Sequence, residues 1–409
     1  MPILRTIASF AGSIADALRG LSTAKSVLVV PSDPWTLTGS IGDAAMLTAV
    51  IAELRSRQRD VPIRILTATD AADAAAAHLR VTPIRVKWHS EAFWDQMRRI
   101  LTAGRVRAVL VLGADVMDGG YNPETARQMV QVADLAASRG IRSIILGFSF
   151  NRRPSETLRE LWAGLRPDVA IHVRDRISLE RFEAHSGRTA TLVADCAFML
   201  KPRPGPTSEA VAAWATGQRQ QGRIVLGVNF HPQLFKDDDD KAFGQLSNAF
   251  RQGIDELSAA KPISFVVIPH DRRSNSDSVA LKAFHAGLAP ALRERVLFVG
   301  DPIGPDEIKS LASHLDGVVT GRMHLAIAAL GMGKPVAALT YQDKFEGLLD
   351  HFALPDWLLM TPEAASDPDE LRLRLLRFTD ALDELASQVG MRLPDVERAS
   401  HRNLAALDL

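Results

Sequence analysis

Short apolar runs alternate with longer amphipathic stretches along most of the chain. In the first half, runs typical of buried strands lie at 26–31, 63–67, 107–113, 142–147, 169–173 and 190–194. Helical stretches lie between them, for example at 43–57, 91–102, 123–138 and 178–184. Alternation of this kind predicts an α/β fold with a mainly parallel, doubly wound sheet.

The alternation restarts after a proline-rich segment, KPRPGPTSE, at residues 201–209. The second half has strand-like runs at 223–229, 263–269, 296–300, 317–321 and 335–340. Helices are expected near 241–259, 278–287, 305–313, 323–331 and 344–352, and a last one at about 368–389 that can cross back onto the first domain. The sequence therefore predicts two Rossmann-like doubly wound domains that face a cleft, at residues 1–205 and 206–365, followed by a helical segment at 366–409.

Composition excludes several classes of protein. The 409 residues include 48 Lys and Arg and 48 Asp and Glu, so no general attraction to nucleic acid is expected, and any anion site must be a local cluster. The single cysteine, Cys196, is expected in the core, and one thiol cannot build a disulfide framework or a thiolate zinc site within one chain. No apolar run is long enough to cross a bilayer.

The N-terminal stretch and one acidic run are expected to have structural rather than functional roles. Apolar residues recur at helical spacing within residues 1–21, but Arg5 and Asp16 interrupt them, which makes a poor secretory signal. We expect this stretch to pack on its own domain or on a partner subunit, with contact to the inner membrane face as the alternative, and we expect a cytoplasmic protein. The acidic run KDDDDK at 236–241 predicts a solvated loop rather than a metal site.

One stretch, residues 317–339, has the pattern of a strand, a small-residue helix and a second strand. Arg322 and His324 fall between the first strand and the helix, at the carboxyl end where open α/β sheets bind ligands. The N-terminus of the helix also offers free N–H groups and a positive dipole. The stretch indicates a site for an anion or a sugar phosphate; the alternative is that Arg322 caps a loop and His324 bonds a backbone carbonyl.

Polar residues follow most of the other predicted strands. Asp43 can cap a helix or bind sugar hydroxyls, and Asp115 with Asp118 can serve polyol binding, base catalysis or simple turn formation. The remaining candidates at strand ends are Gly42, Ser149, Asn151, Arg174, His270, Tyr341 and Lys344. Polar residues at so many strand ends indicate an active cleft.

The order of seven motifs along the chain resembles the polysaccharide pyruvyl transferase family. The motifs are GSIGDAAML, VLVLGADVMDGG, GFSFN, VRDRIS, VADCAFML, IPHD and GRMHLAIAALGMGKPVAALTYQDK, and the resemblance covers most of residues 26–350. It implies two Rossmann-like domains arranged as in GT-B glycosyltransferases. It also implies transfer of pyruvate from phosphoenolpyruvate to a sugar, as a cyclic ketal, in exopolysaccharide or cell-envelope glycan synthesis.

Three departures from the family pattern fall mainly on the side expected to hold the acceptor. Ala44 stands where the family often has glutamate after Gly-Asp, and Ala114 and Asp115 interrupt what is often a run of glycines. Cys196 stands where a proline usually follows the aspartate. These differences bear on the identity of the acceptor more than on the identity of the donor.

The resemblance assigns roles to the candidate residues. Arg174, Arg322, Lys344 and His270 are expected to bind the phosphate and carboxylate of the donor. His324 is expected to be the acid, with His270 as a second candidate, while Asp43 and Asp115 orient or deprotonate hydroxyl groups. The expected acceptor contacts are Gly42, Asp118, Ser149 and Asn151. No metal or other cofactor is expected.

Two alternatives remain open at this point. A glycosyltransferase of the same architecture would use a nucleotide-sugar donor. A catalytically inactive relative would only bind a glycan or a partner protein, which the altered motifs around Gly42 and Gly113 would fit.

Overall fold

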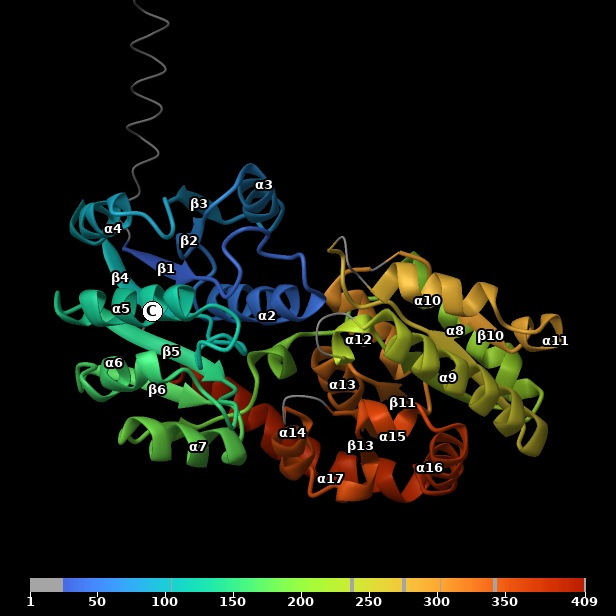
Figure 1. Cartoon of the computed structure of the whole chain (residues 1–409). Helices are drawn as coiled ribbons and strands as arrows, with labels where there is room; N and C mark the ends of the chain where they lie inside the picture. Colours follow the sequence, from blue (N-terminus) through green and yellow to red (C-terminus); the bar gives the residue numbers. More distant parts are fainter. Residues whose placement is uncertain are drawn as a thin grey trace, which may run out of the picture.

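The computed structural model describes residues 25–407 except 104, 236–238, 274–276, 302 and 341–343. The amphipathic stretch at 1–21, half of the acidic run and Tyr341 lie outside the described residues. The chain forms two parallel-sheet α/β domains (Figure 1), as the sequence predicts. Within the described residues, no helix is both long and apolar enough to cross a membrane.

The first domain has a seven-stranded parallel sheet in the order β3-β2-β1-β4-β5-β6-β7. Its strands are β1 (Ser26–Val30), β2 (Ile63–Thr67), β3 (Thr82–Arg85), β4 (Val106–Val111), β5 (Arg142–Phe148), β6 (Val169–Val173) and β7 (Thr191–Leu192). Its helices are α2 (Ile41–Arg57), α3 (Asp70–His78), α4 (Ala92–Ala103), α5 (Pro123–Ala137), α6 (Arg159–Ala163) and α7 (Arg176–Ser186). The strand order reverses between β1 and β4, which is where doubly wound folds bind their ligands.

The second domain repeats this plan with six parallel strands in the order β10-β9-β8-β11-β12-β13. The strands are β8 (Ile224–Asn229), β9 (Ile263–Val267), β10 (Val296–Phe298), β11 (Gly317–Thr320), β12 (Val336–Leu339) and β13 (Leu359–Met360). The helices are α8 (Pro206–Gln220), α9 (Asp240–Ala260), α10 (Asp277–Ala286), α11 (Pro290–Arg293), α12 (Pro305–Ser313), α13 (Met323–Leu330) and α14 (Phe345–His351). The reversal here lies between β8 and β11, so the predicted β11–α13–β12 unit starts at the switch point.

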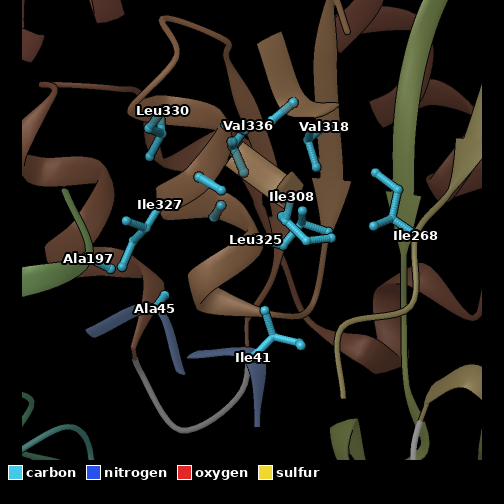
Figure 2. Packing of buried hydrophobic residues seen from close by; sticks show 14 of the residues in the cluster. Ile41, Ala45, Ala197, Ile268, Ile308, Val318, Leu325, Ile327, Leu330 and Val336 are labelled. Atoms are coloured by element: carbon cyan, nitrogen blue, oxygen red, sulfur yellow. The ribbon is translucent and has the colours of Figure 1, made fainter. Parts of the chain in front are cut away.

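Apolar side chains join the two domains beneath the cleft. In Figure 2, Ala45 of α2 and Ala197 of the first domain lie beside Ile327 of α13 in the second, and Ile41 of α2 lies farther along the same contact. All four belong to one buried cluster. Helix α2 therefore packs on α13, and this contact sets the position of one helix N-terminus relative to the other.

The C-terminal segment returns to the first domain. The helix expected at 368–389 is two helices, α16 (Pro368–Asp380) and α17 (Leu382–His401), preceded by α15 (Pro362–Ala365). After α17, Asn403 Oδ1 accepts a hydrogen bond from Gly147 N (2.7 Å) and its Nδ2 donates to Ala194 O (2.8 Å). The segment thus crosses back as expected, while the domain limits at 205 and 365 stay a prediction.

Candidate active site

A cavity of about 540 Å³ lies between the domains, at the carboxyl ends of both sheets. The loops after β1, β4 and β6 form the wall from the first domain, and the loops after β8, β9, β11 and β12 form the wall from the second. Of the predicted residues, those that line the cavity are Gly42, Asp43, Asp115, Arg174, His270, Arg322, His324 and Lys344.

Arg322 precedes the first turn of α13 and is held by three side chains. Its Nε lies 3.3 Å from Asp277 Oδ2, its Nη1 donates to Gln233 Oε1 (3.1 Å), and its Nη2 lies 3.4 Å from Asp271 Oδ2. The side chain is only 11% exposed. Two carboxylates behind the guanidinium fix its orientation toward the cavity, so no reorganisation is needed when an anion binds.

His324 lies in the first turn of α13, beside a buried ion pair. Its Nε2 is 3.6 Å from Asp195 Oδ2, and the same oxygen is 2.9 Å from Arg174 Nη1. Burial raises the pKa of Asp195, but His324 and Arg174 outweigh it and lower the pKa to about 2. Asp195 is therefore an anion at any ordinary pH and holds Arg174 and His324 in place.

Gly42 leaves space for the His324 ring. A Cβ on Gly42, in the first turn of α2, would lie 2.2 Å from His324 Nδ1, which is closer than real contacts allow. The imidazole therefore lies against the backbone of α2. The two helix N-termini meet at this histidine, and both carry the positive end of a helix dipole.

Asp43 follows Gly42 and accepts a hydrogen bond from Ser32 Oγ at 2.6 Å. Burial raises the pKa of Asp43 to about 6; the Ser32 hydrogen bond acts in the opposite direction, and Asp115 and Asp33 add to the rise. A carboxylate with a pKa near neutrality can exchange a proton at physiological pH, which suits a general base.

Lys344 bridges the cavity from the second domain to the first. Its Nζ donates to Asp115 Oδ2 (2.6 Å) and to Tyr121 Oη (2.8 Å), and its side chain is 5% exposed. Burial raises the pKa of Asp115, but Lys344 and Arg174 outweigh it and hold the pKa well below its usual range. Asp115 is thus a fixed anion and a poorer base than Asp43.

His270 follows β9 and is 4% exposed at the cavity wall. Among the described residues, neither ring nitrogen has a hydrogen-bond partner. Burial lowers the pKa of His270 well below its usual range, and the charges of His324 and Arg322 act in the same direction. The ring is neutral and can offer one N–H and one acceptor to a ligand.

Three predicted acceptor contacts lie away from the cavity: Asp118, Ser149 and Asn151 are not among its lining residues. Asp118 is 1% exposed and accepts N–H bonds from Gly120 (2.8 Å) and Asn151 (3.2 Å), so it fastens two loops together. Ser149 is 3% exposed, and its Oγ has no partner among the described residues.

Sequence reasoning missed several residues that complete the site. Asp195 stands directly after a short strand-like run, the same position that singled out Arg174, and this signal could have found it. Ser32, Asp33, Trp35, Tyr121, Gln233 and Arg273 also line the cavity. Within the described part of the chain, no group of His, Cys, Asp and Glu has the arrangement of a metal site.

Solved structures share the fold with this chain at low sequence identity. A UDP-GlcNAc 2-epimerase from Neisseria meningitidis, bound to UDP-GlcNAc, superposes with a TM-score of 0.56 at 13% identity and covers 94% of this chain and 99% of its own. Anabaena HepE, in complex with UDP and glucose, gives 0.54 at 13% identity over 94% of this chain and 100% of its own. A glycosyltransferase from Rickettsia africae gives 0.55 at 9% identity over 93% and 94%.

These similarities confirm the predicted GT-B-like fold class and say nothing finer. A comparison with curated proteins found no match. The family model of polysaccharide pyruvyl transferases matches residues 41–343, which is most of the chain. The match includes seven of the eight predicted residues that line the cavity; Lys344 lies just beyond it. The chain therefore belongs to the polysaccharide pyruvyl transferase family, as its motifs indicate.

Proposed function

We propose that this protein transfers pyruvate from phosphoenolpyruvate to two hydroxyl groups of a sugar, forming a cyclic ketal and releasing phosphate. The observation that carries the proposal is the cluster of fixed cations around His324 in one cavity. Arg174, Arg322 and Lys344 all line the cavity and are all largely buried.

The cations match the donor because phosphoenolpyruvate carries a phosphate and a carboxylate. Arg322 is held from behind by carboxylates, so its guanidinium is oriented in advance for bidentate binding. The free N–H groups at the start of α13 add to the attraction for an anion. Neutral His270 contributes a hydrogen bond rather than a charge.

The chemistry needs one acid and one base. His324 donates a proton to the methylene carbon of phosphoenolpyruvate, and the resulting positive charge at C2 is shared with the oxygen that carries the phosphate. A sugar hydroxyl adds to C2 as Asp43 accepts its proton. The bond between C2 and the phosphate oxygen then breaks with its electron pair on phosphate, and the second hydroxyl takes its place at C2.

The protons balance over the whole reaction. Two hydroxyl protons are released; one replaces the proton that His324 gave to carbon, and the other leaves on phosphate. Asp43 suits the base because its pKa of about 6 lets it accept and release a proton near neutrality. Asp115 is ionised throughout and keeps Lys344 in place.

A second candidate is a glycosyltransferase with a nucleotide-sugar donor. It is favoured by the fold alone, since the UDP-bound structures named above share that fold at 13% identity.

The test is turnover with defined donors. Purified protein is incubated with phosphoenolpyruvate and a panel of lipid-linked and free oligosaccharides, and the products are examined by NMR for the methyl signal of a pyruvate ketal. The proposal expects a ketal and an equal amount of phosphate, both lost in His324→Ala. Transfer of a sugar from UDP- or GDP-sugars, without ketal from phosphoenolpyruvate, would establish the second candidate instead.

A further inference from the structure

Trp35 places an indole in the cavity wall that the proposed chemistry does not use. It is 36% exposed and lines the cavity together with Asp33 and Asp43. Trp88 and His89 pack against it, with ring centroids 6.2 and 5.5 Å from that of Trp35. The indole is thus supported by aromatic rings within the protein while more than a third of it is open to solvent.

The loop that carries Trp35 is held in a defined shape. Asp33 Oδ1 accepts the backbone N–H of Trp35 (2.9 Å) and of Thr36 (3.2 Å), and Thr69 Oγ1 donates to Trp35 O. Leu37 has φ of 58°, a left-handed conformation that a leucine adopts only when its surroundings impose it. The position of the indole is therefore built by the loop.

The loop is also tied to the donor side of the cavity. Ser40 forms a backbone bridge with Asp271, and Arg272 N donates to Gly39 O (3.0 Å). Asp271 is one of the two carboxylates that hold Arg322. These contacts therefore fix the position of the Trp35 indole relative to Arg322 across the cleft.

The residues around Trp35 determine which kind of ligand can stack on the indole. Its wall carries three carboxylates, Asp33, Asp43 and Asp115. Lys344 is paired with Asp115, so Asp33 and Asp43 are the carboxylates that accept hydrogen bonds from hydroxyl groups and repel anions. The C–H groups on one side of a pyranose ring carry slight positive charge and meet the negative face of an indole favourably. An aromatic ring beside carboxylates therefore fits a sugar ring without charge.

We propose that Trp35 is the stacking platform for the acceptor, and that the sugar unit bound there is an uncharged pyranose. The proposal rests on the proposed function in one respect, since that function makes a sugar the acceptor. Trp35 holds the ring while Asp43, in the same wall, meets the hydroxyl groups that become the ketal.

The experiment measures sugar binding directly, without turnover. Saturation-transfer NMR titrations use the methyl glycosides of glucose, galactose and mannose, and methyl glucuronoside as the charged counterpart. At least one neutral glycoside is expected to bind, with a Kd that rises about tenfold in Trp35→Ala and less in Trp35→Phe. Trp214→Ala, in helix α8 away from the cavity, is the matched control and should leave the Kd unchanged.

Several outcomes would overturn the proposal. They are equal binding by the wild type and Trp35→Ala, binding of methyl glucuronoside as tight as that of the neutral sugars, and binding of none of the three neutral glycosides. Should Trp35→Ala fail to fold, as judged by circular dichroism, Trp35→Phe carries the test.

Parallel calorimetry with phosphoenolpyruvate separates this proposal from the proposed function. Trp35→Ala is expected to bind phosphoenolpyruvate as the wild type does. Sugar binding that depends on Trp35, in a protein that does not bind phosphoenolpyruvate, would contradict the proposed function and support the platform. Binding of phosphoenolpyruvate, without sugar binding that depends on Trp35, would contradict the platform alone.

Discussion

The two walls of the cavity come from the same kind of structure and carry opposite chemistry. Each is made of loops at the carboxyl ends of a parallel sheet, at the point where the strand order reverses. The wall from the first domain presents Asp33, Asp43 and Asp115 with an exposed indole, whereas the wall from the second presents Arg273, Arg322, His324 and Lys344. The fold supplies two equivalent edges, and in the proposed function their side chains divide them between a sugar and an anion.

Arg174 is the exception that joins the walls. It comes from the first domain, but its Nη2 lies 3.0 Å from Met323 Sδ and its Nη1 is paired with Asp195, which also faces His324. In the proposed function, this buried cation from the first domain completes the donor site of the second. The division between walls is thus one of charge and not of domain.

The largest effect is expected from breaking the buried ion pair between Arg174 and Asp195. Arg174→Gln leaves Asp195 buried without its cation, which should cost about 3–5 kcal/mol of stability. It should also abolish phosphoenolpyruvate binding. The urea midpoint and calorimetry are the measurements. The matched control is Arg176→Gln, whose side chain is 55% exposed in its ion pairs, so the urea midpoint should hardly change. Equal losses in both variants would contradict the account.

The next largest effect is expected from a change at the contact between Gly42 and the His324 ring, where the two walls meet. Gly42→Ala puts a Cβ where His324 Nδ1 lies and must displace the ring, which should lower the rate of phosphoenolpyruvate-dependent turnover about 100-fold. Binding of the donor should change little. Gly217→Ala is the control, because a Cβ there meets nothing within 4 Å and alanine favours the helix. An active Gly42→Ala variant would show that His324 need not lie against α2.

The acidic wall also predicts a pH dependence. The pKa of Asp43 is about 6 in the folded protein against an ordinary value of 3.8, so the folded state binds more protons between these values. The stability that Asp43 contributes is full below pH 3.8 and is lost as the pH rises through 6. Asp43→Asn should therefore gain stability relative to the wild type across that window, while turnover is lost.

Thermal melts and rates at several pH values check this prediction. The melting temperature of Asp43→Asn should exceed that of the wild type above pH 6, and the difference should vanish near pH 4. The wild-type rate should fall as the pH drops below 6, because the base becomes protonated. A stability difference that is independent of pH would refute the raised pKa.

The smallest effect is expected at Ser149. Its hydroxyl is buried away from the cavity without a partner among the described residues, so Ser149→Ala should be neutral or slightly stabilising. Activity and acceptor preference should not change. A raised KM for the acceptor in this variant would return Ser149 to the acceptor site that its place after β5 suggested.

Local pattern was enough to place Arg322 and His324 in the second wall, although Gln233 and Arg273 of the same wall were missed. The strand, small-residue helix and strand at residues 317–339 form β11, α13 and β12, and Arg322 and His324 lie where the parallel-sheet rule puts them. The edge strand β3 was missed because its sequence, TPIR, is short, half-exposed and contains a proline.

Residues after strands in the first domain could not be sorted by position alone. Asp115 and Asp118 are three residues apart, yet one meets Lys344 from the other domain and the other turns inward to bond Gly120 and Asn151. The contact of Gly42 with His324 joins residues far apart in the chain, and nothing in either motif shows it. Such long-range contacts are decided by packing between domains.

The most direct test of the central account is a calorimetric titration with phosphoenolpyruvate, beside UDP- and GDP-sugars, in the wild type, Arg322→Ala and His324→Ala. We predict that the wild type binds phosphoenolpyruvate, that Arg322→Ala loses this binding, and that His324→Ala keeps it while losing turnover. Binding of a nucleotide sugar without binding of phosphoenolpyruvate would contradict the account.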